Sequence, residues 1–225
     1  MKAFSHRFFG FASAFLALTT IASAASATDI LKEHLDLDID YSGGALSLDW
    51  KTYTNMSSGV PLNNDDWAAP GNAVVIPIAN SYVVPSGSQW ACLGSAGTTV
   101  YRAKQNFVSN ELFLGWNAQD VPLSTFQSDK IQLEVVSVVS APANGRFVLY
   151  TTNSFGTPTY QLNTTSGTCK DSSMDISVGP TYGHVHGWWA FSAAGTYTIR
   201  LRARGTLTGG TVVTSSSVDY TFKVQ

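Results

Sequence analysis

Three of the four histidines in the 225-residue chain lie in two short motifs that could hold a metal ion. His34-Leu-Asp36 lies near the start of the chain, and His184-Val-His186 lies near its end. Residues two apart in a β-strand point to the same face, so each motif would place two ligands together. Imidazole nitrogens combined with a carboxylate oxygen suit divalent transition metals such as zinc or copper. The four residues are therefore a candidate site for one such ion.

The two motifs can form one site only if their strands lie close together. Facing Cβ atoms on paired strands are about 4.5–5.5 Å apart, and same-face residues on one strand are about 6.6–6.8 Å apart. Side chains from two nearby strands could therefore surround one ion. We expect the strand that carries His34 to lie beside the strand that carries His184, or one strand away. In the alternative interpretation the histidines are ordinary outward-facing polar residues and bind no metal.

Alternation of apolar and polar residues predicts that both motifs lie in strands. In HLDLDIDY, residues 34–41, the apolar residues alternate with one histidine and three aspartates. We expect a half-buried strand with Asp36, Asp38 and Asp40 on a solvated face. These carboxylates could attract calcium, but calcium loops wrap their ligands around a turn. After the turn residues SGG, ALSLDW (45–50) alternates again and predicts a hairpin.

The rest of the chain shows the same kind of pattern, with Gly, Pro, Asn or Ser between most segments. Further strands are expected at AVVIPI (73–78), SYVV (81–84), WACLG (90–94), TTVYRA (98–103), ELFLGW (111–116), KIQLEVVSVV (130–139), RFVLYT (146–151), PTYQL (158–162), MDISV (174–178), HVHGWWAF (184–191), TYTIRLRA (196–203) and SVDYTFKV (217–224). In TYTIRLRA, Tyr197, Ile199 and Leu201 should face the core. Many short strands with frequent turns predict an all-β fold, an antiparallel β-sandwich of Ig-like or jelly-roll-like type.

The first 27 residues have the features of a secretory signal peptide: a basic start, an apolar run and small residues in an A-x-A pattern. Cleavage fits after Ala24 or after Ala27, and we expect the second; an uncleaved amphipathic anchor is the alternative. Residues 28–225 should then form a single domain, with no later transmembrane segment. Charged residues make up 12% of the chain, the formal net charge is −2 and the pI is about 6.0. This balance excludes an electrostatic attraction to nucleic acid or anionic lipid. We expect a secreted, periplasmic or extracellular surface location.

The chain has two cysteines, Cys92 and Cys169. In an oxidising compartment an even pair predicts a disulfide, which would contribute about 4 kcal/mol on the loop-entropy model. Two separately buried thiols are the alternative. The absence of a CxxC motif argues against redox catalysis and against a zinc ribbon.

Three segments carry a family resemblance that covers most of the mature chain in the right order. They are EHLDLDIDYSGGALSLDW, CLGSAGTTVYRAKQ followed by ELFLGWNAQ, and GHVHGWWAFSAAGTYTIRLRARG. They resemble the beginning, middle and end of the bacterial surface-anchored repeat proteins, which include the choice-of-anchor M domain. The residues that match the first and last motifs are His34, Asp36, His184, His186, Trp189, Phe191, Gly195 and Tyr197.

The resemblance implies a bacterial secreted or cell-surface β-domain in which metal handling is plausible. Some members are similar to proteins encoded beside metal-type ABC transporters, so a cell-surface or transport component is an expected partner. The chain departs from the family in its second strand, where histidines are common and only Asp49 is a potential ligand here. The sequence also ends without an LPxTG-type signal or an apolar tail, which favours a freely secreted or periplasmic product.

Three hypotheses for function follow. The first is a secreted or surface binding module, not an enzyme, that coordinates zinc or copper through the two motifs. The second is a structural or adhesive extracellular domain without metal. The third is a metal-dependent hydrolase, which would need an open coordination position and a general base such as Asp36 or Glu33.

Overall fold

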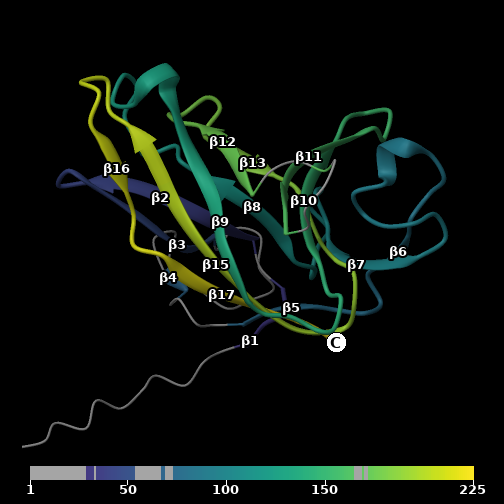
Figure 1. Cartoon of the computed structure of the whole chain (residues 1–225). Helices are drawn as coiled ribbons and strands as arrows, with labels where there is room; N and C mark the ends of the chain where they lie inside the picture. Colours follow the sequence, from purple (N-terminus) through teal and green to yellow (C-terminus); the bar gives the residue numbers. More distant parts are fainter. Residues whose placement is uncertain (1–28, 33, 54–66, 69–72, 165–168, 170–171) are drawn as a thin grey trace, which may run out of the picture.

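Strands dominate the computed structural model of the chain (Figure 1), which describes residues 29–32, 34–53, 67–68, 73–164, 169 and 172–225. The expected signal peptide, residues 1–27, lies outside the described residues, as does Glu33. The only helices in the described part are two short 3₁₀ turns, η2 (Ser88–Trp90) and η3 (Gln127–Asp129). The predicted all-β sandwich is confirmed.

Within the described residues the strands form three hydrogen-bonded sheets. The seven-stranded sheet contains, in order, β1 (Asp29–Ile30), β5 (Ala73–Ile76), β17 (Val218–Val224), β15 (Gly195–Thr206), β9 (Lys130–Ser140) and β12 (Ser173–Ser177), with β16 (Val212–Thr214) also paired to β15. The first five-stranded sheet contains β11 (Pro158–Asn163), β10 (Phe147–Thr152), β14 (Trp188–Phe191), β7 (Thr99–Ala103) and β6 (Ser81–Val83). The second contains β13 (His184–His186), β8 (Phe113–Asn117), β2 (His34–Ser42), β3 (Ala45–Tyr53) and β4 (Trp67–Ala68).

Among the strands that the structure describes most pairs are antiparallel, but three are parallel: β1 with β5, β5 with β17, and β2 with β8. The predicted hairpin is formed by β2 and β3, with Ser42 opposite Ala45. Gly43 and Gly44 have φ angles of 60° and 85°. Two successive positive φ angles are what a two-residue hairpin turn of the primed type requires, and glycine adopts them without steric cost.

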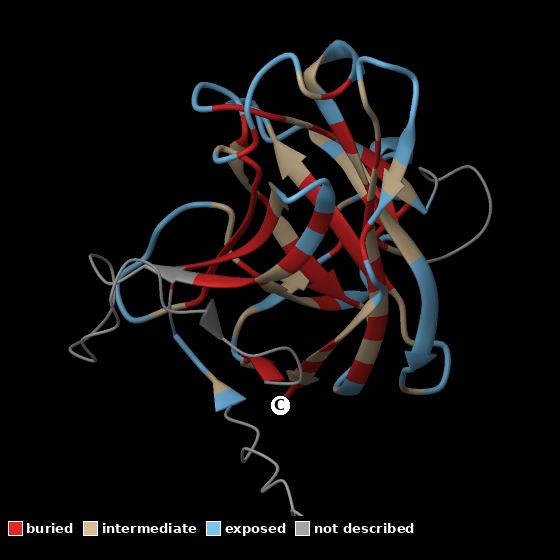
Figure 2. Cartoon of the chain, turned by 90° about the vertical axis from the view of Figure 1, so that its left-hand side faces the viewer, coloured by how far each residue is buried: buried red, intermediate tan, exposed pale blue. Residues whose placement is uncertain are grey.

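The larger of the two hydrophobic cores among the described residues fills the space between the three sheets, and Figure 2 shows the buried segments gathered there, with exposed segments mainly in the loops. Trp50 on β3 is fully buried where the sheets meet. Its ring centroid lies 5.6 Å from that of Trp189 on β14 and 5.3 Å from that of Tyr220 on β17. Trp50 therefore joins all three sheets, because its neighbours belong to the other two.

Two of the expected strands differ in the structure. Residues 90–94 contain no strand: η2 ends at Trp90 and a turn follows. The flanking Gly87 and Gly94 have φ angles of 117° and 152°, and Trp90 packs against a smaller second core. The segment 184–191 is divided at Gly187 into β13 and β14, which belong to different sheets. The three predicted inward-facing residues of TYTIRLRA are buried as expected.

Cys92 and Cys169 form the predicted disulfide, with Cα atoms 5.4 Å apart. The bridge joins the turn after η2 to the connection between β11 and β12. In the described part of the chain no helix is long and apolar enough to cross a membrane.

We expect loss of this disulfide to destabilise the fold without changing it. The bridge closes a loop of 77 residues, so replacing both cysteines with alanine should lower the free energy of unfolding by about 4 kcal/mol on the loop-entropy model. Urea unfolding monitored by circular dichroism measures this loss. Each single substitution should cost about as much as the double one, and a double variant with wild-type stability would contradict the expectation.

Candidate metal centre

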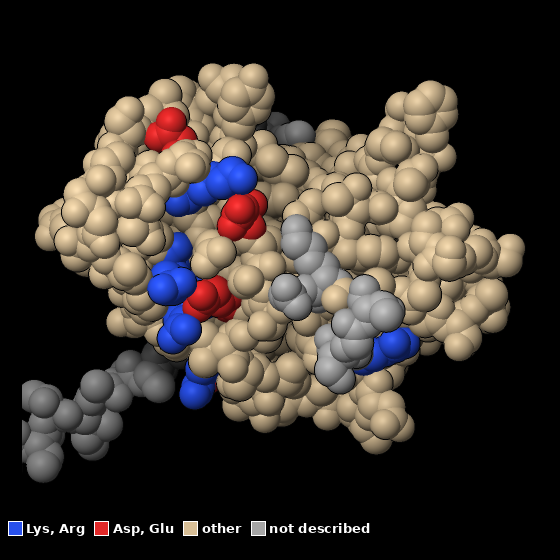
Figure 3. Space-filling view, turned by 45° about the horizontal axis from the view of Figure 1, so that its top comes forward, with Lys and Arg blue, Asp and Glu red and all other residues tan. Residues whose placement is uncertain are grey.

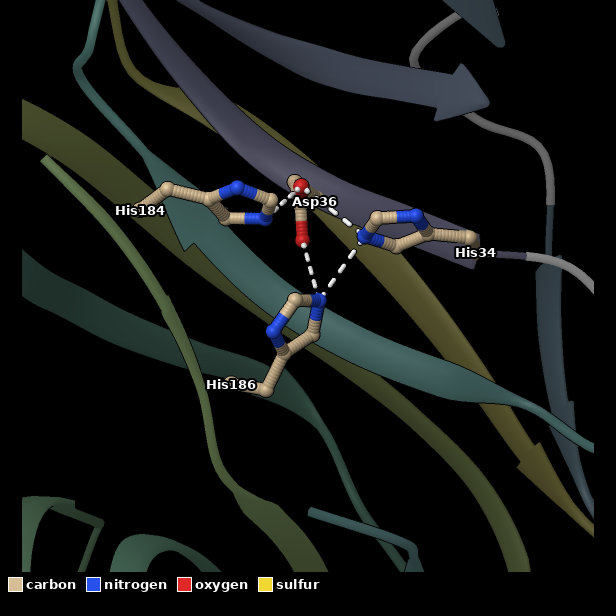
Figure 4. A group of neighbouring side chains, drawn as sticks. All are labelled: His34, Asp36, His184 and His186. Atoms are coloured by element: carbon tan, nitrogen blue, oxygen red, sulfur yellow. Dashed lines mark hydrogen bonds and ion pairs between the residues drawn. The ribbon is translucent and has the colours of Figure 1, made fainter. Parts of the chain in front are cut away.

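The four side chains of the two motifs converge in the structure, as Figure 4 shows. One ligand atom from each of His34, Asp36, His184 and His186 lies within 4.8 Å of all the others. His34 and Asp36 come from β2, and the other two histidines come from β13. The two strands are separated by β8 alone, so the expectation of a one-strand separation is confirmed.

The three imidazoles approach one another and the carboxylate through their Nε2 atoms. Nε2 of His184 lies 2.7 Å from Oδ2 of Asp36, and Nε2 of His34 lies 3.4 Å from the same oxygen. Nε2 of His186 lies 3.4 Å from Oδ1 of Asp36 and 2.8 Å from Nε2 of His34. Ligand atoms about 2.0–2.1 Å from a tetrahedral ion are about 3.3 Å apart. The observed spacings scatter around this value.

The register of the three strands places the ligands in rows on one face of the sheet. Asp36 on β2 pairs with Gly115 on β8, and Gly115 pairs in turn with His186 on β13. Two residues further along β8, Asn117 pairs with Asp38 on one side and with His184 on the other. The opposite face of β2 carries leucine and isoleucine residues of the core. The same alternation that buries the core therefore directs the ligands to the other face.

Gly115 permits the outer ligands to meet above the middle strand. A Cβ atom at this position would lie 2.2 Å from Oδ1 of Asp36 and 2.9 Å from Cδ2 of His186. Any other residue would thus displace the carboxylate or the imidazole. The sequence analysis did not identify this glycine as part of the site. The sequence could have indicated it, because a glycine inside a predicted strand often marks a position that other groups approach closely.

Two further glycines confine the short strand β13. A Cβ atom on Gly183 would lie 2.6 Å from the carbonyl oxygen of Gly179. A Cβ atom on Gly187 would lie 2.9 Å from the Trp116 ring and 3.1 Å from the Leu149 side chain. The backbone on both sides of the two histidines is therefore packed against fixed parts of the fold. This packing holds both imidazoles at the edge of the sheet, above the neighbouring strand.

Asp36 is fully buried, yet its surroundings favour the charged form of its carboxylate. Burial has the largest single effect and by itself raises the pKa. Hydrogen bonds with His184 and His34, together with the charge attraction of both imidazoles, outweigh it, and the pKa of Asp36 lies below its ordinary value. The same hydrogen bond with Asp36 raises the pKa of His184. A negative charge is thus maintained in the interior beside three imidazoles.

The ring of His186 also contacts an apolar side chain, in addition to the polar cluster. Its ring stacks on Phe113 with centroids 3.6 Å apart and an interplanar angle of 9°. Burial lowers the pKa of His186 to about 4, against the opposing effect of Asp36. His186 is therefore neutral at pH 7, which is the form that coordinates metal ions.

The expectation of a solvated face on β2 is wrong for Asp36 and Asp38, whereas Asp40 is half-buried. Asp36 is 0% exposed and Asp38 is 3% exposed. Burial raises the pKa of Asp38 to about 7, although the nearby Lys51 ammonium acts in the opposite direction. Lys51 is also buried, lies opposite Asp36 on β3, and places its Nζ atom 3.1 Å from Oδ2 of Asp120. The predicted alternation of apolar and polar residues along β2 and β3 is correct, but the part of the polar face around Asp36 and Asp38 is buried instead of solvated.

The chain was compared with protein-family models, with characterised proteins and with solved structures, and none of the three comparisons gives a significant match. The geometry of the described residues therefore carries the functional argument.

We expect a methyl group at Gly115 to damage the cluster specifically. Gly115→Ala should lower the free energy of unfolding by about 1–3 kcal/mol, as overpacking of a filled site does. It should also displace Asp36 or His186. Gly209→Ala is the matched control, because a Cβ atom there has no neighbour within 4 Å. Chemical denaturation and histidine NMR shifts would measure both effects, and equal behaviour of the two variants would contradict the role of Gly115.

Proposed function

We propose that this chain is a secreted or cell-surface β-sandwich binding module that coordinates one divalent transition metal ion through His34, Asp36, His184 and His186. The observation that carries the proposal is the convergence of three Nε2 atoms on a fully buried carboxylate. An isolated charge in a protein interior is costly unless it is paired. A divalent cation would neutralise the carboxylate of Asp36 and would be coordinated by the imidazoles around it.

The donor set favours zinc(II) or copper(II). Three imidazole nitrogens with one carboxylate oxygen are borderline ligands, and no sulfur belongs to the cluster. The two cysteines are joined to each other and leave no thiolate in competition. By the general order of affinities, copper(II) should bind more tightly than zinc(II) at such a site.

A binding role fits the geometry better than hydrolysis. Four protein donors complete a tetrahedral set, whereas catalytic zinc sites keep one position for water or substrate. The Asp36 side chain has no exposed surface, and that of His34 is 9% exposed. Asp36 is itself a ligand in this arrangement, so it would not serve as a general base.

The proposal includes the wider biological setting. The disulfide fits an oxidising compartment, and the sequence motifs resemble those of surface-anchored repeat and choice-of-anchor M proteins. We therefore place the chain with these bacterial proteins outside the cytoplasm. A transport or cell-surface component is the corresponding partner.

Metal binding should depend on the clustered residues and not on the overall acidity of the chain. His186→Ala and Asp36→Asn should each weaken zinc and copper binding at least 100-fold, because each removes one of four donors. Asp175→Asn, which changes an exposed carboxylate outside the cluster, should leave the affinity unchanged. Titration calorimetry and elemental analysis of protein without a histidine tag provide the measurement. Weak binding that is equal in all four proteins would leave the structural or adhesive domain as the function.

Acid should weaken metal binding. A proton competes with the ion for each Nε2 atom, so affinity falls as the pH falls. The pKa of His184 is raised by its hydrogen bond with Asp36, whereas that of His186 is lowered to about 4 by burial. The loss should therefore begin through His184, at a higher pH than for an ordinary histidine. Calorimetric titrations between pH 8 and pH 5 would detect it, and a constant affinity across this range would contradict coordination by the histidines.

A further inference from the structure

A polar hollow lies on the seven-stranded sheet, whereas the histidine cluster belongs to a different sheet. It has a volume of about 450 Å³ and is formed by the loop around η3 together with parts of β9, β12 and β15. The lining includes two cations, two amides and two hydroxyls: Arg204, Lys130, Gln127, Gln132, Ser128 and Thr206. The volume is within the range of about 300–1,000 Å³ that small-molecule sites occupy.

Three arginines alternate along the outward face of β15, and two of them have carboxylate partners. Arg200 forms two hydrogen bonds with Asp219, from Nε to Oδ1 at 2.6 Å and from Nη2 to Oδ2 at 2.8 Å. Nε of Arg202 donates to Oε2 of Glu134 at 2.5 Å. Figure 3 shows basic side chains in a column on one face of the molecule, with acidic side chains beside them.

The third arginine, Arg204, breaks this pattern. Its neighbour on β9 is the neutral amide Gln132, at the position where Arg202 has an acid. Among the described residues that line the hollow, the one carboxylate, on Asp175, is 3.4 Å from Nζ of Lys130 and 3.3 Å from Nε2 of Gln132. The described lining therefore has two cations and one carboxylate, an excess of one positive charge. A guanidinium presents paired N–H donors that match a carboxylate.

The loop of residues 124–129 forms a fixed wall for this hollow. Phe126 is 1% exposed and occupies the space that a side chain on Gly205 would need, since a Cβ atom there would lie 2.5 Å from the ring. The N–H of Thr208 donates to the carbonyl oxygen of Thr125 at 3.0 Å. Ser128 has a φ of 57°, a backbone conformation that non-glycine residues adopt at a cost and that is frequent at binding sites.

We propose that this hollow binds an acidic sugar, meaning a sugar unit that carries a carboxylate, as in uronate-containing polysaccharides. The guanidinium of Arg204 would hold the carboxylate, beside the ion pair of Lys130 and Asp175. The amides and hydroxyls of the lining both donate and accept hydrogen bonds, which suits the hydroxyl groups of a sugar. The lining residues that the structure describes offer no apolar side chain to a hydrophobic ligand. The site does not depend on metal binding at the histidine cluster.

The test uses trigalacturonate as the probe, with its methyl ester as a neutral analogue of the same shape. NMR titration of the isotope-labelled protein should show trigalacturonate shifting the amide signals around Arg204 and Thr206. Arg204→Gln should weaken binding at least tenfold. Arg200→Gln is the matched control, on the same face of the same strand, and should change the affinity less than twofold. Thermal unfolding of both variants would verify that they are folded.

Weakening of at least tenfold on methyl esterification would support recognition of the carboxylate. Inorganic phosphate and sulfate are titrated in parallel, because a simple anion site would bind them as well as it binds the sugar. Equal binding of these ions, equal loss in the two arginine variants, equal binding of the ester, or no binding of trigalacturonate at millimolar concentration would each overturn the proposal.

Discussion

The buried carboxylate of Asp36 is the constraint on which the candidate site depends. A charge without exposed surface requires compensating partners, because the interior solvates it far less well than water does. The partners come from 148 to 150 residues later in the chain, on β13, and from two residues earlier on β2. Three features follow from this convergence: a middle strand with no side chain at Gly115, a short edge strand between two glycines, and imidazoles presented through equivalent nitrogens.

The apolar face of the same strands keeps this arrangement in register. Leu35 and Leu37 on β2, together with Leu114 and Trp116 on β8, are buried in the core. A slip of one residue would exchange the two faces of a strand and move its apolar side chains out of the core. The core therefore selects the register, and the register sets Asp36 beside Gly115 and His186.

Trp50 links this sheet to the other two, which relates the site to the whole sandwich. Its contacts with Trp189 and Tyr220 join β3 to β14 and β17. The chain passes directly from His186 through Gly187 to β14, so the edge strand that carries two ligands is anchored in a second sheet. The hollow beside Arg204 lies on the outward face of β15, in the seven-stranded sheet. The residues that line this hollow are distinct from the four residues of the histidine cluster.

The sequence by itself determined most of the strands, though not the turn at residues 90–94, together with the β2–β3 hairpin, the pairing of its only two cysteines and the four residues of the cluster. These follow from local alternation, turn residues, an even cysteine count and the scarcity of histidine. Only the tertiary structure decided that β2 and β8 are parallel, that Gly115 lies beneath the cluster, that Asp36 and Asp38 are buried, and that the chain changes sheets at Gly187. The physical reason is that alternation specifies the face on which a side chain lies. It does not specify which strand becomes the neighbour or what covers the polar face, because both depend on packing between residues far apart in the chain.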